Sequence, residues 1–135
     1  YSGYAYNASY IGGDYTIDGQ PYIDDYTDRI HRTCNISEIA DPAGTVLVAD
    51  GGYGDPVNAQ NFLRAPSDMF FQAGTVHYRH NSTASVAYAD GHVKAVTTIY
   101  RHFVNLPWLR MGSGTYETSP NTGALSEDDS AYDLN

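Results

Sequence analysis

The strongest constraint on the fold is a pair of strand-like segments separated by Asp90-Gly91. Residues 84–89 alternate small or polar side chains with apolar ones, and residues 92–99 continue as a run rich in β-branched residues. An Asp-Gly pair between two such runs is a strong hairpin signal, because a tight primed turn needs positive φ at its two central residues. We therefore predict a β-hairpin that turns at Asp90-Gly91 and ends the core of the domain.

A second strand is predicted over Thr45–Ala49, a continuous apolar run that stops at Asp50. A run without alternation indicates that both faces of the strand are covered. The segment 51–68 is rich in Gly, Pro, Asn and Asp, so we expect a long surface loop there, with one helical turn near Ala59–Leu63. Shorter extended pieces are expected at Tyr4–Tyr10 and Tyr15–Ile17.

The length of 135 residues is that of one ordinary domain. We expect a globular part over 1–111, in which 100–111 is a helix or an extended docking segment carrying Trp108. Residues 112–135 are rich in Gly, Ser, Thr and acidic residues, which predicts a solvated tail. The fold class expected is α+β and strand-rich, with an antiparallel sheet, long loops, a C-terminal hairpin and little helix.

The charge and composition exclude several function classes. The net charge of −9 opposes contact with phosphate backbones and with anionic membrane surfaces, so nucleic acid is not an expected partner. No apolar run is long enough to span a bilayer. Thirteen Tyr, with abundant Gly, Thr and Ser, indicate an extracellular, strand-rich chain. Cys34 is the one cysteine, so no internal disulfide forms, and a buried apolar role is expected for it.

The segment from Val76 to Val93 contains a spaced motif: His80 is followed by nine residues and then by Asp90-Gly91. This arrangement resembles the H-x9-D-G signature of prepilin-type processing-associated proteins, which are relatives of type IV pilins and of type II secretion pseudopilins. Two further stretches, 36–50 and 2–7, resemble the family in the same order along the chain. The resemblance covers about residues 1–99.

The resemblance implies a pilin-like globular domain in a structural subunit of an extracellular bacterial filament or pseudopilus. It implies copies of the same chain in a helical assembly as partners, a cell-surface location, and no catalytic activity. The family also carries an N-terminal processing site and a long apolar helix. That helix is absent from this sequence, so the resemblance describes the fold of the subunit more closely than the way subunits pack.

The three motif residues have structural explanations. Gly91 adopts turn geometry that other residues resist, and Asp90 accepts hydrogen bonds from turn N–H groups. Nine intervening residues place His80 and Asp90 at opposite ends of one strand, since an extended residue spans about 3.3 Å. This placement disfavours a catalytic His–Asp pair, although a hydrolase using His80 with Asp50 or Asp90 stays open as an alternative.

Asp50 and Asp90 each follow a strand that ends in Ala-Asp-Gly. If those two strands were parallel neighbours, the two carboxylates would share one sheet edge, and Asp55 would join them from the loop. Oxygen ligands of this kind suit Ca²⁺, so calcium is a candidate cofactor at Asp50, Asp55 and Asp90; otherwise no cofactor is expected. The other interpretation is that these aspartates cap turns.

Three N-x-S/T sequons begin at Asn7, Asn35 and Asn81, and they are candidate glycosylation sites. Exposed Tyr and Trp108 would also suit stacking on sugars. The alternative to a filament subunit is therefore a secreted carbohydrate-binding or adhesive surface module that recognises surface glycans.

Overall fold

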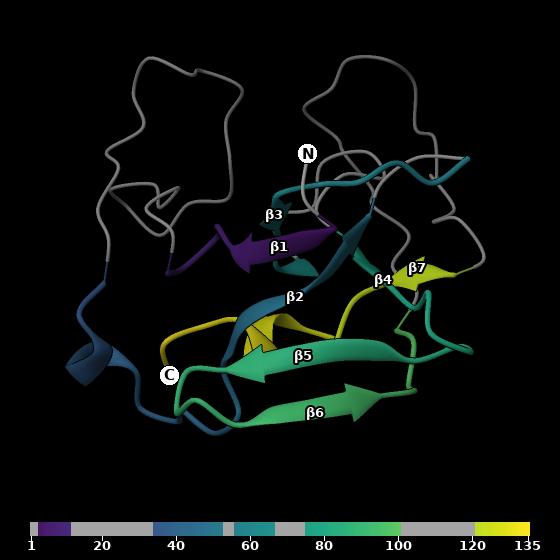
Figure 1. Ribbon diagram of the computed structural model, residues 1–135. Helices are drawn as coiled ribbons and strands as arrows, with labels where there is room; N and C mark the ends of the chain where they lie inside the picture. The colour runs from purple at the N-terminus through teal and green to yellow at the C-terminus, as the bar shows by residue number, and fades with distance from the viewer. Residues whose placement is uncertain (1–2, 12–33, 53–55, 67–74, 101–120) are drawn as a thin grey trace, which may run out of the picture.

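The computed structural model describes residues 3–11, 34–52, 56–66, 75–100 and 121–135. Within these ranges the protein is a curled mixed β-sheet with two short 3-10 turns and almost no other helix (Figure 1). The strands are β1 (Tyr4–Asn7), β2 (Val46–Gly52), β3 (Phe62–Leu63), β4 (Thr75–His77), β5 (Ala84–Tyr88), β6 (Val93–Val96) and β7 (Thr122–Gly123), and the 3-10 turns are η1 (Ile36–Glu38) and η3 (Asp129–Ala131). The strand-rich prediction is confirmed.

β2 is the centre of the sheet. β1 pairs antiparallel with one edge of β2, and β5 and β4 pair antiparallel with the other. A strand is confirmed at the predicted place, although it begins at Val46 and not at Thr45, and it continues to Gly52. Gly51, near the end of this strand, lies close to β1. A Cβ on Gly51 would lie 2.4 Å from the Cβ of Ala5. The prediction that both faces of this strand are covered is wrong at Leu47. This residue lies at a bulge and is 37% exposed.

The predicted hairpin exists as β5 paired with β6, but its turn differs from the predicted one. Only Gly91 has positive φ (94°) in this loop, and its N–H donates to the Tyr88 carbonyl oxygen at 2.9 Å. The Tyr88 N–H donates to the His92 carbonyl oxygen, which leaves a three-residue loop. Such a loop has a type I turn followed by one left-handed residue, so Asp90 does not need positive φ.

One face of the sheet forms the core. Register pairs Ala5 with Ala49 and Ala49 with Val86, and all three side chains are buried. Two tyrosines, Tyr78 and Tyr132, are the largest fully buried side chains against this face. Tyr78 donates its hydroxyl hydrogen bond to the Thr98 and Ala124 carbonyl oxygens, so its polar tip is satisfied inside the core.

The segment predicted as a solvated tail, 112–135, is part of the domain in its described portion, 121–135. β7 pairs with β4, and Ala124 forms a bridge with Tyr100. Tyr132 is fully buried, and its hydroxyl accepts a hydrogen bond from the Leu125 N–H at 2.9 Å. The β5–β6 hairpin therefore does not end the core, and the predicted domain boundary at 111 does not hold for these residues. Composition misled here because a few buried residues are interspersed among many polar ones.

The expected loop over 51–68 also contains a strand. β3 pairs in parallel with β1, with Tyr6 opposite Phe62, and Leu63 and Ala65 are fully buried. The helical turn expected near Ala59–Leu63 is therefore wrong, and the predicted antiparallel sheet is in fact mixed. β3 has two residues, too few to show the alternation on which strand prediction depends.

Other expectations fall outside the described ranges. The strand expected at Tyr15–Ile17 and the segment with Trp108 belong to this group. Among the residues that the structure does describe, no helix has the length and apolar character to cross a membrane.

We predict that Tyr132→Ala destabilises the domain by about 3–5 kcal/mol, because it empties a fully buried aromatic site and leaves the Leu125 N–H without its acceptor. Glu127→Ala is the matched control, since Glu127 is exposed in the same segment. Urea unfolding of both variants measures the difference. Equal stabilities would show that the segment is the solvated tail that its composition indicates.

Candidate functional site

The candidate site lies at the point on β2 where the neighbouring strand changes from β5 to β4. β5 pairs with β2 from Val46 to Ala49, and β4 pairs with Gly51 and Gly52. Both strands pair with the edge of β2 that β1 does not occupy, so they follow one another along that edge. Residues 78–83 leave the edge between them, and Asp50 is the β2 residue opposite this gap.

Asp50 is buried, with 2% of its side chain exposed, and its carboxylate is surrounded by donors from the chain that leaves the edge. Its Oδ2 accepts a hydrogen bond from the Ser85 backbone N–H at 2.8 Å and lies 3.3 Å from His80 Nε2. Its Oδ1 lies 3.7 Å from Arg79 Nε. A buried carboxylate is costly unless it is paired and hydrogen-bonded, and these three groups supply that compensation.

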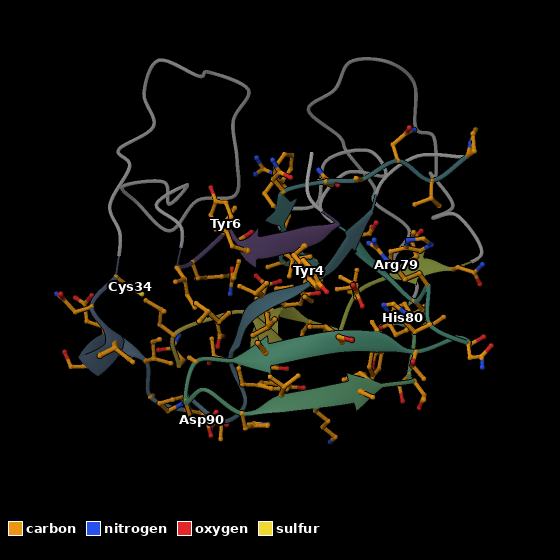
Figure 2. The ribbon with its side chains drawn as sticks, in the orientation of Figure 1. Tyr4, Tyr6, Cys34, Arg79, His80 and Asp90 are labelled. Atoms are coloured by element: carbon orange, nitrogen blue, oxygen red, sulfur yellow. The ribbon has the colours of Figure 1, made fainter. Side chains whose placement is uncertain are left out.

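Arg79 also connects Asp50 to the start of the described chain. One of its terminal nitrogens donates to the Gly3 carbonyl oxygen at 2.8 Å and to the carbonyl oxygen of Gly51. Figure 2 shows Arg79 and His80 together at one end of the sheet. A Cβ on Gly3 would lie 2.4 Å from an Arg79 nitrogen, so a larger residue there would force the guanidinium to shift. The guanidinium therefore joins β1, β2 and the 78–83 segment.

A tight turn at Asn81-Ser82 holds His80 beside Asp50. Asn81 and Ser82 both have positive φ, 53° and 61°, and the backbones of His80 and Thr83 exchange two hydrogen bonds at 3.0 Å. Positive φ at both central residues defines the primed turn of a two-residue loop. The primed turn that the sequence predicted at Asp90-Gly91 is thus found at Asn81-Ser82.

Asp90 lies at the other end of β5, away from His80, as the nine-residue spacing predicts (Figure 2). Its Oδ1 accepts the His92 backbone N–H at 3.0 Å and lies 2.6 Å from His92 Nδ1. The His92 ring stacks on Tyr88 with centroids 4.4 Å apart. The Asp90 N–H donates to the Pro42 carbonyl oxygen at 3.0 Å, which fastens the turn to the chain just before β2.

Two pKa shifts describe the electrostatics. Hydrogen bonds from the His92 backbone and ring, with the backbone bond larger, lower the pKa of Asp90. Desolvation and then the charge of Arg79 lower the pKa of His77, against an opposing effect of Asp50. The neutral form of the His77 imidazole is therefore favoured, and Arg79 is the fixed positive charge near this end of the sheet.

The proposed calcium set is not brought together. Because β2 and β5 are antiparallel and not parallel, Asp50 and Asp90 lie at opposite ends of β5. Asp55 lies outside the described residues. Within the described ranges, no group of three or more His, Cys, Asp or Glu side chains has the geometry of a metal site. Asp50 instead contacts Arg79 and His80, and Asp90 caps its own turn.

The arrangement places His80 beside Asp50, which is the pair that the hydrolase alternative requires. A nucleophilic mechanism needs a hydroxyl or thiol within hydrogen-bond reach of the imidazole. Among the described residues, the His80 ring makes no hydrogen bond to a Ser, Thr or Cys side chain. Cys34 is distant in Figure 2, is partly exposed rather than buried as expected, and has a thiol pKa raised by burial and then by Glu38. The described contacts of Asp50 are the ion pair with Arg79, the contact with His80 and the hydrogen bond from the Ser85 N–H.

The three sequons divide into two groups. Asn7 is fully buried, and its Nδ2 donates to the Val46 carbonyl oxygen at 3.1 Å and to that of Tyr132 at 2.7 Å. A glycan attaches at this nitrogen, so the Asn7 candidate is wrong for the folded chain. Asn35 and Asn81 are exposed, and both stay candidate acceptors.

Sequence reasoning missed Arg79 and Ser85, the partners of Asp50. The signal present was Arg79, a fixed positive charge next to a histidine, which indicates a carboxylate partner elsewhere in the chain. Choosing Asp50 from sixteen Asp and Glu residues needed the antiparallel pairing of β2 and β5, which the sequence alone does not specify.

Comparison with known proteins gives no match: no family model, no curated protein and no solved structure matches the chain.

We predict that Asp50→Ala lowers the free energy of unfolding by about 3 kcal/mol, because it removes the acceptor of a partly buried N–H and the carboxylate that contacts Arg79 and His80. Asp50→Asn keeps an oxygen for Ser85 and is expected to cost less. His80→Asn is expected to cost under about 1 kcal/mol, since the His80 side chain is 57% exposed. Denaturant unfolding gives all three values.

Asp90→Asn is the matched control for Asp50→Asn, because the same chemical change is made at a side chain that is 38% exposed. It is expected to lower stability less than Asp50→Asn. Equal losses for the two variants would contradict a central role for the Asp50 carboxylate.

We also predict that the Asp90 carboxyl titrates below its ordinary pKa of 3.8. A carboxyl with a depressed folded pKa contributes stability above its unfolded pKa and loses that contribution as pH falls through the folded value. His92→Ala keeps the backbone donor, which is the larger cause, so it should raise the Asp90 pKa only part of the way. NMR titration of the carboxyl carbon measures both values, and a wild-type midpoint at or above 3.8 would refute the capping interpretation.

Proposed function

We propose that this chain is the globular part of a pilin-like structural subunit of an extracellular bacterial filament or pseudopilus, and that it has no catalytic activity. The observation that carries the proposal is the placement of the His80-x9-Asp90-Gly91 motif. His80 contacts Asp50 at one end of β5, and the Asp90-Gly91 turn contacts Pro42 at the other. The motif therefore spans one strand from end to end.

The fixed spacing of the motif follows from the length of the neighbouring strand. The Ala89 N–H donates to the Thr45 carbonyl oxygen at 3.0 Å, and the Ser85 N–H donates to Asp50 at 2.8 Å. The chain from His80 to the turn must match the stretch of β2 between those two acceptors. Inserting or removing a residue would break one end contact, so the spacing has an architectural reason that needs no chemistry.

The separation of His80 and Asp90 supports a structural function over a catalytic one. Residues that act together on a substrate must converge, and these two lie at opposite ends of β5 with different partners. The Tyr-rich and Ser/Thr-rich composition supports a location outside the cell, and the exposed Asn35 and Asn81 are compatible with glycans there.

Electron microscopy of cell-surface material from the producing cells tests the proposal. Antibody raised against the folded chain and coupled to gold should decorate regular filaments, because the subunit domains would lie on the filament surface. Gold found only on non-filamentous surface material would refute the filament role. A preparation lacking the gene for the chain is the control for antibody specificity.

A further inference from the structure

The turn before β2 contains an Asp-Pro peptide bond, between Asp41 and Pro42. Such a bond differs from other peptide bonds on both of its sides. Proline supplies a nitrogen without an N–H, which departs as a secondary amine when the bond breaks. Aspartate supplies a carboxyl group that reaches the carbonyl carbon of its own residue, where it can act as a nucleophile. The bond therefore carries its own nucleophile, and its surroundings decide whether the reaction is assisted.

Among the described residues, three donor atoms contact the carbonyl oxygen of this bond. The Asp41 oxygen accepts from the Gly44 N–H at 3.1 Å and from the Thr45 N–H at 2.9 Å. The Thr45 hydroxyl donates to the same oxygen at 2.9 Å and shares its hydrogen with the Asp133 carbonyl oxygen at 3.0 Å. A neutral carbonyl oxygen has one lone pair fewer than the oxyanion of a tetrahedral intermediate. The three donors therefore match the oxyanion better than the carbonyl.

The Asp41 carboxyl group is held beside that carbonyl. Its Oδ1 accepts the Gly44 N–H at 3.1 Å, so one donor contacts both the carboxyl and the carbonyl oxygen. A Cβ at position 44 would collide with Asp41 Oδ2, so the glycine makes room for the carboxyl group. Two reacting groups held side by side react faster than freely rotating ones, because the entropy of bringing them together is already lost.

Other parts of the fold fix the remaining atoms around the bond. The Pro42 carbonyl oxygen accepts the Asp90 N–H at 3.0 Å, so the residue after the bond is tied to the β5–β6 turn. Thr45 is 1% exposed, so the fold and not the solvent sets the position of its donors. Asp41 itself is exposed, so water has access to it. Preorganised donors at a water-accessible carbonyl favour hydrolysis of this bond.

We propose that the Asp41-Pro42 peptide bond is a self-cleavage site of the folded chain. A carboxyl oxygen of Asp41 bonds to the Asp41 carbonyl carbon, and the carboxyl proton passes to the Pro42 nitrogen. The carbon–nitrogen bond breaks, so Pro42 departs as a secondary amine and Asp41 becomes a cyclic anhydride. One water molecule then opens the anhydride and restores two carboxyl groups on Asp41. Water is the sole co-reactant, and no atom changes its oxidation state.

The products are the segments 1–41 and 42–135, and they are expected to stay together. β1 remains paired with β2, and the Asn7 amide still donates to the carbonyl oxygens of Val46 and Tyr132. Each chain reacts once and only on itself. The inference is therefore compatible with a subunit that acts on no other molecule, and it does not depend on filament assembly.

Mass spectrometry of the purified chain during incubation in mildly acidic buffer measures the cut after Asp41. Thr45→Val removes the hydroxyl donor and keeps both N–H donors, so it should slow this cut at least about tenfold in the folded chain. In urea the donors are no longer held in place, so wild type and Thr45→Val should be cut at the same rate. The Asp55-Pro56 bond is the reference within the same molecule, and its rate should not respond to Thr45→Val.

Circular dichroism confirms that each variant is folded, and Gly44→Ala repeats the test by displacing the carboxyl group if Thr45→Val does not fold. Equal rates for the folded wild type and the folded variant, or no cut after Asp41, overturn the inference and show that Asp41 only caps its turn. A cut at the same place in Asp41→Ala also overturns it, because that product needs another nucleophile. So does a rate that rises with protein concentration, since the proposed reaction occurs within one chain.

Discussion

The carboxylate of Asp50 is the constraint on which the rest of the described structure depends. It is a buried charge on the central strand, opposite the place where the neighbouring strand is interrupted. Such a charge must have donors, and Arg79, His80 and Ser85 provide them from one short stretch of chain. Residues 78–83 therefore turn back toward β2 after they leave its edge, which brings Arg79 and His80 to Asp50. Arg79 then extends the same network to Gly3, so the edge of β1 is placed by a group whose own position is set by Asp50.

Sequence patterns predicted the parts of the fold that depend on local chemistry. The strand at Thr45–Ala49 and the hairpin at Asp90-Gly91 were recognisable because each contains enough β-branched or alternating residues and a turn signal. β3 and the buried Tyr132 were not, since two residues show no period and a single buried side chain in a polar segment shows no pattern. The prediction of the candidate site failed for a related reason. The calcium hypothesis required β2 and β5 to be parallel, and strand direction is a property of the whole sheet.

β5 illustrates how end contacts can replace side-chain size in setting register. Its residues Ala84, Ser85 and Ala87 have small side chains, so side-chain volume constrains the register less at these positions than at the buried Val86. The side-chain pattern alone therefore specifies the register of β5 only weakly. The Ser85 N–H bond to Asp50 at one end and the Ala89 N–H bond to Thr45 at the other remove that freedom. The spacing of the His80-x9-Asp90-Gly91 motif follows from the need to form both of these end contacts.

The hydrogen bond from Asn7 to the Tyr132 carbonyl oxygen joins residues 125 positions apart. Its consequence concerns the order of events during synthesis. β1 precedes Tyr132 along the chain, so during synthesis its buried Asn7 amide lacks one of its acceptors until Tyr132 has been made. Contacts between such distant segments slow folding, because the connecting chain must be ordered before they can form. The Asn7 amide is thus fully hydrogen-bonded only once Tyr132 has taken its place in the fold.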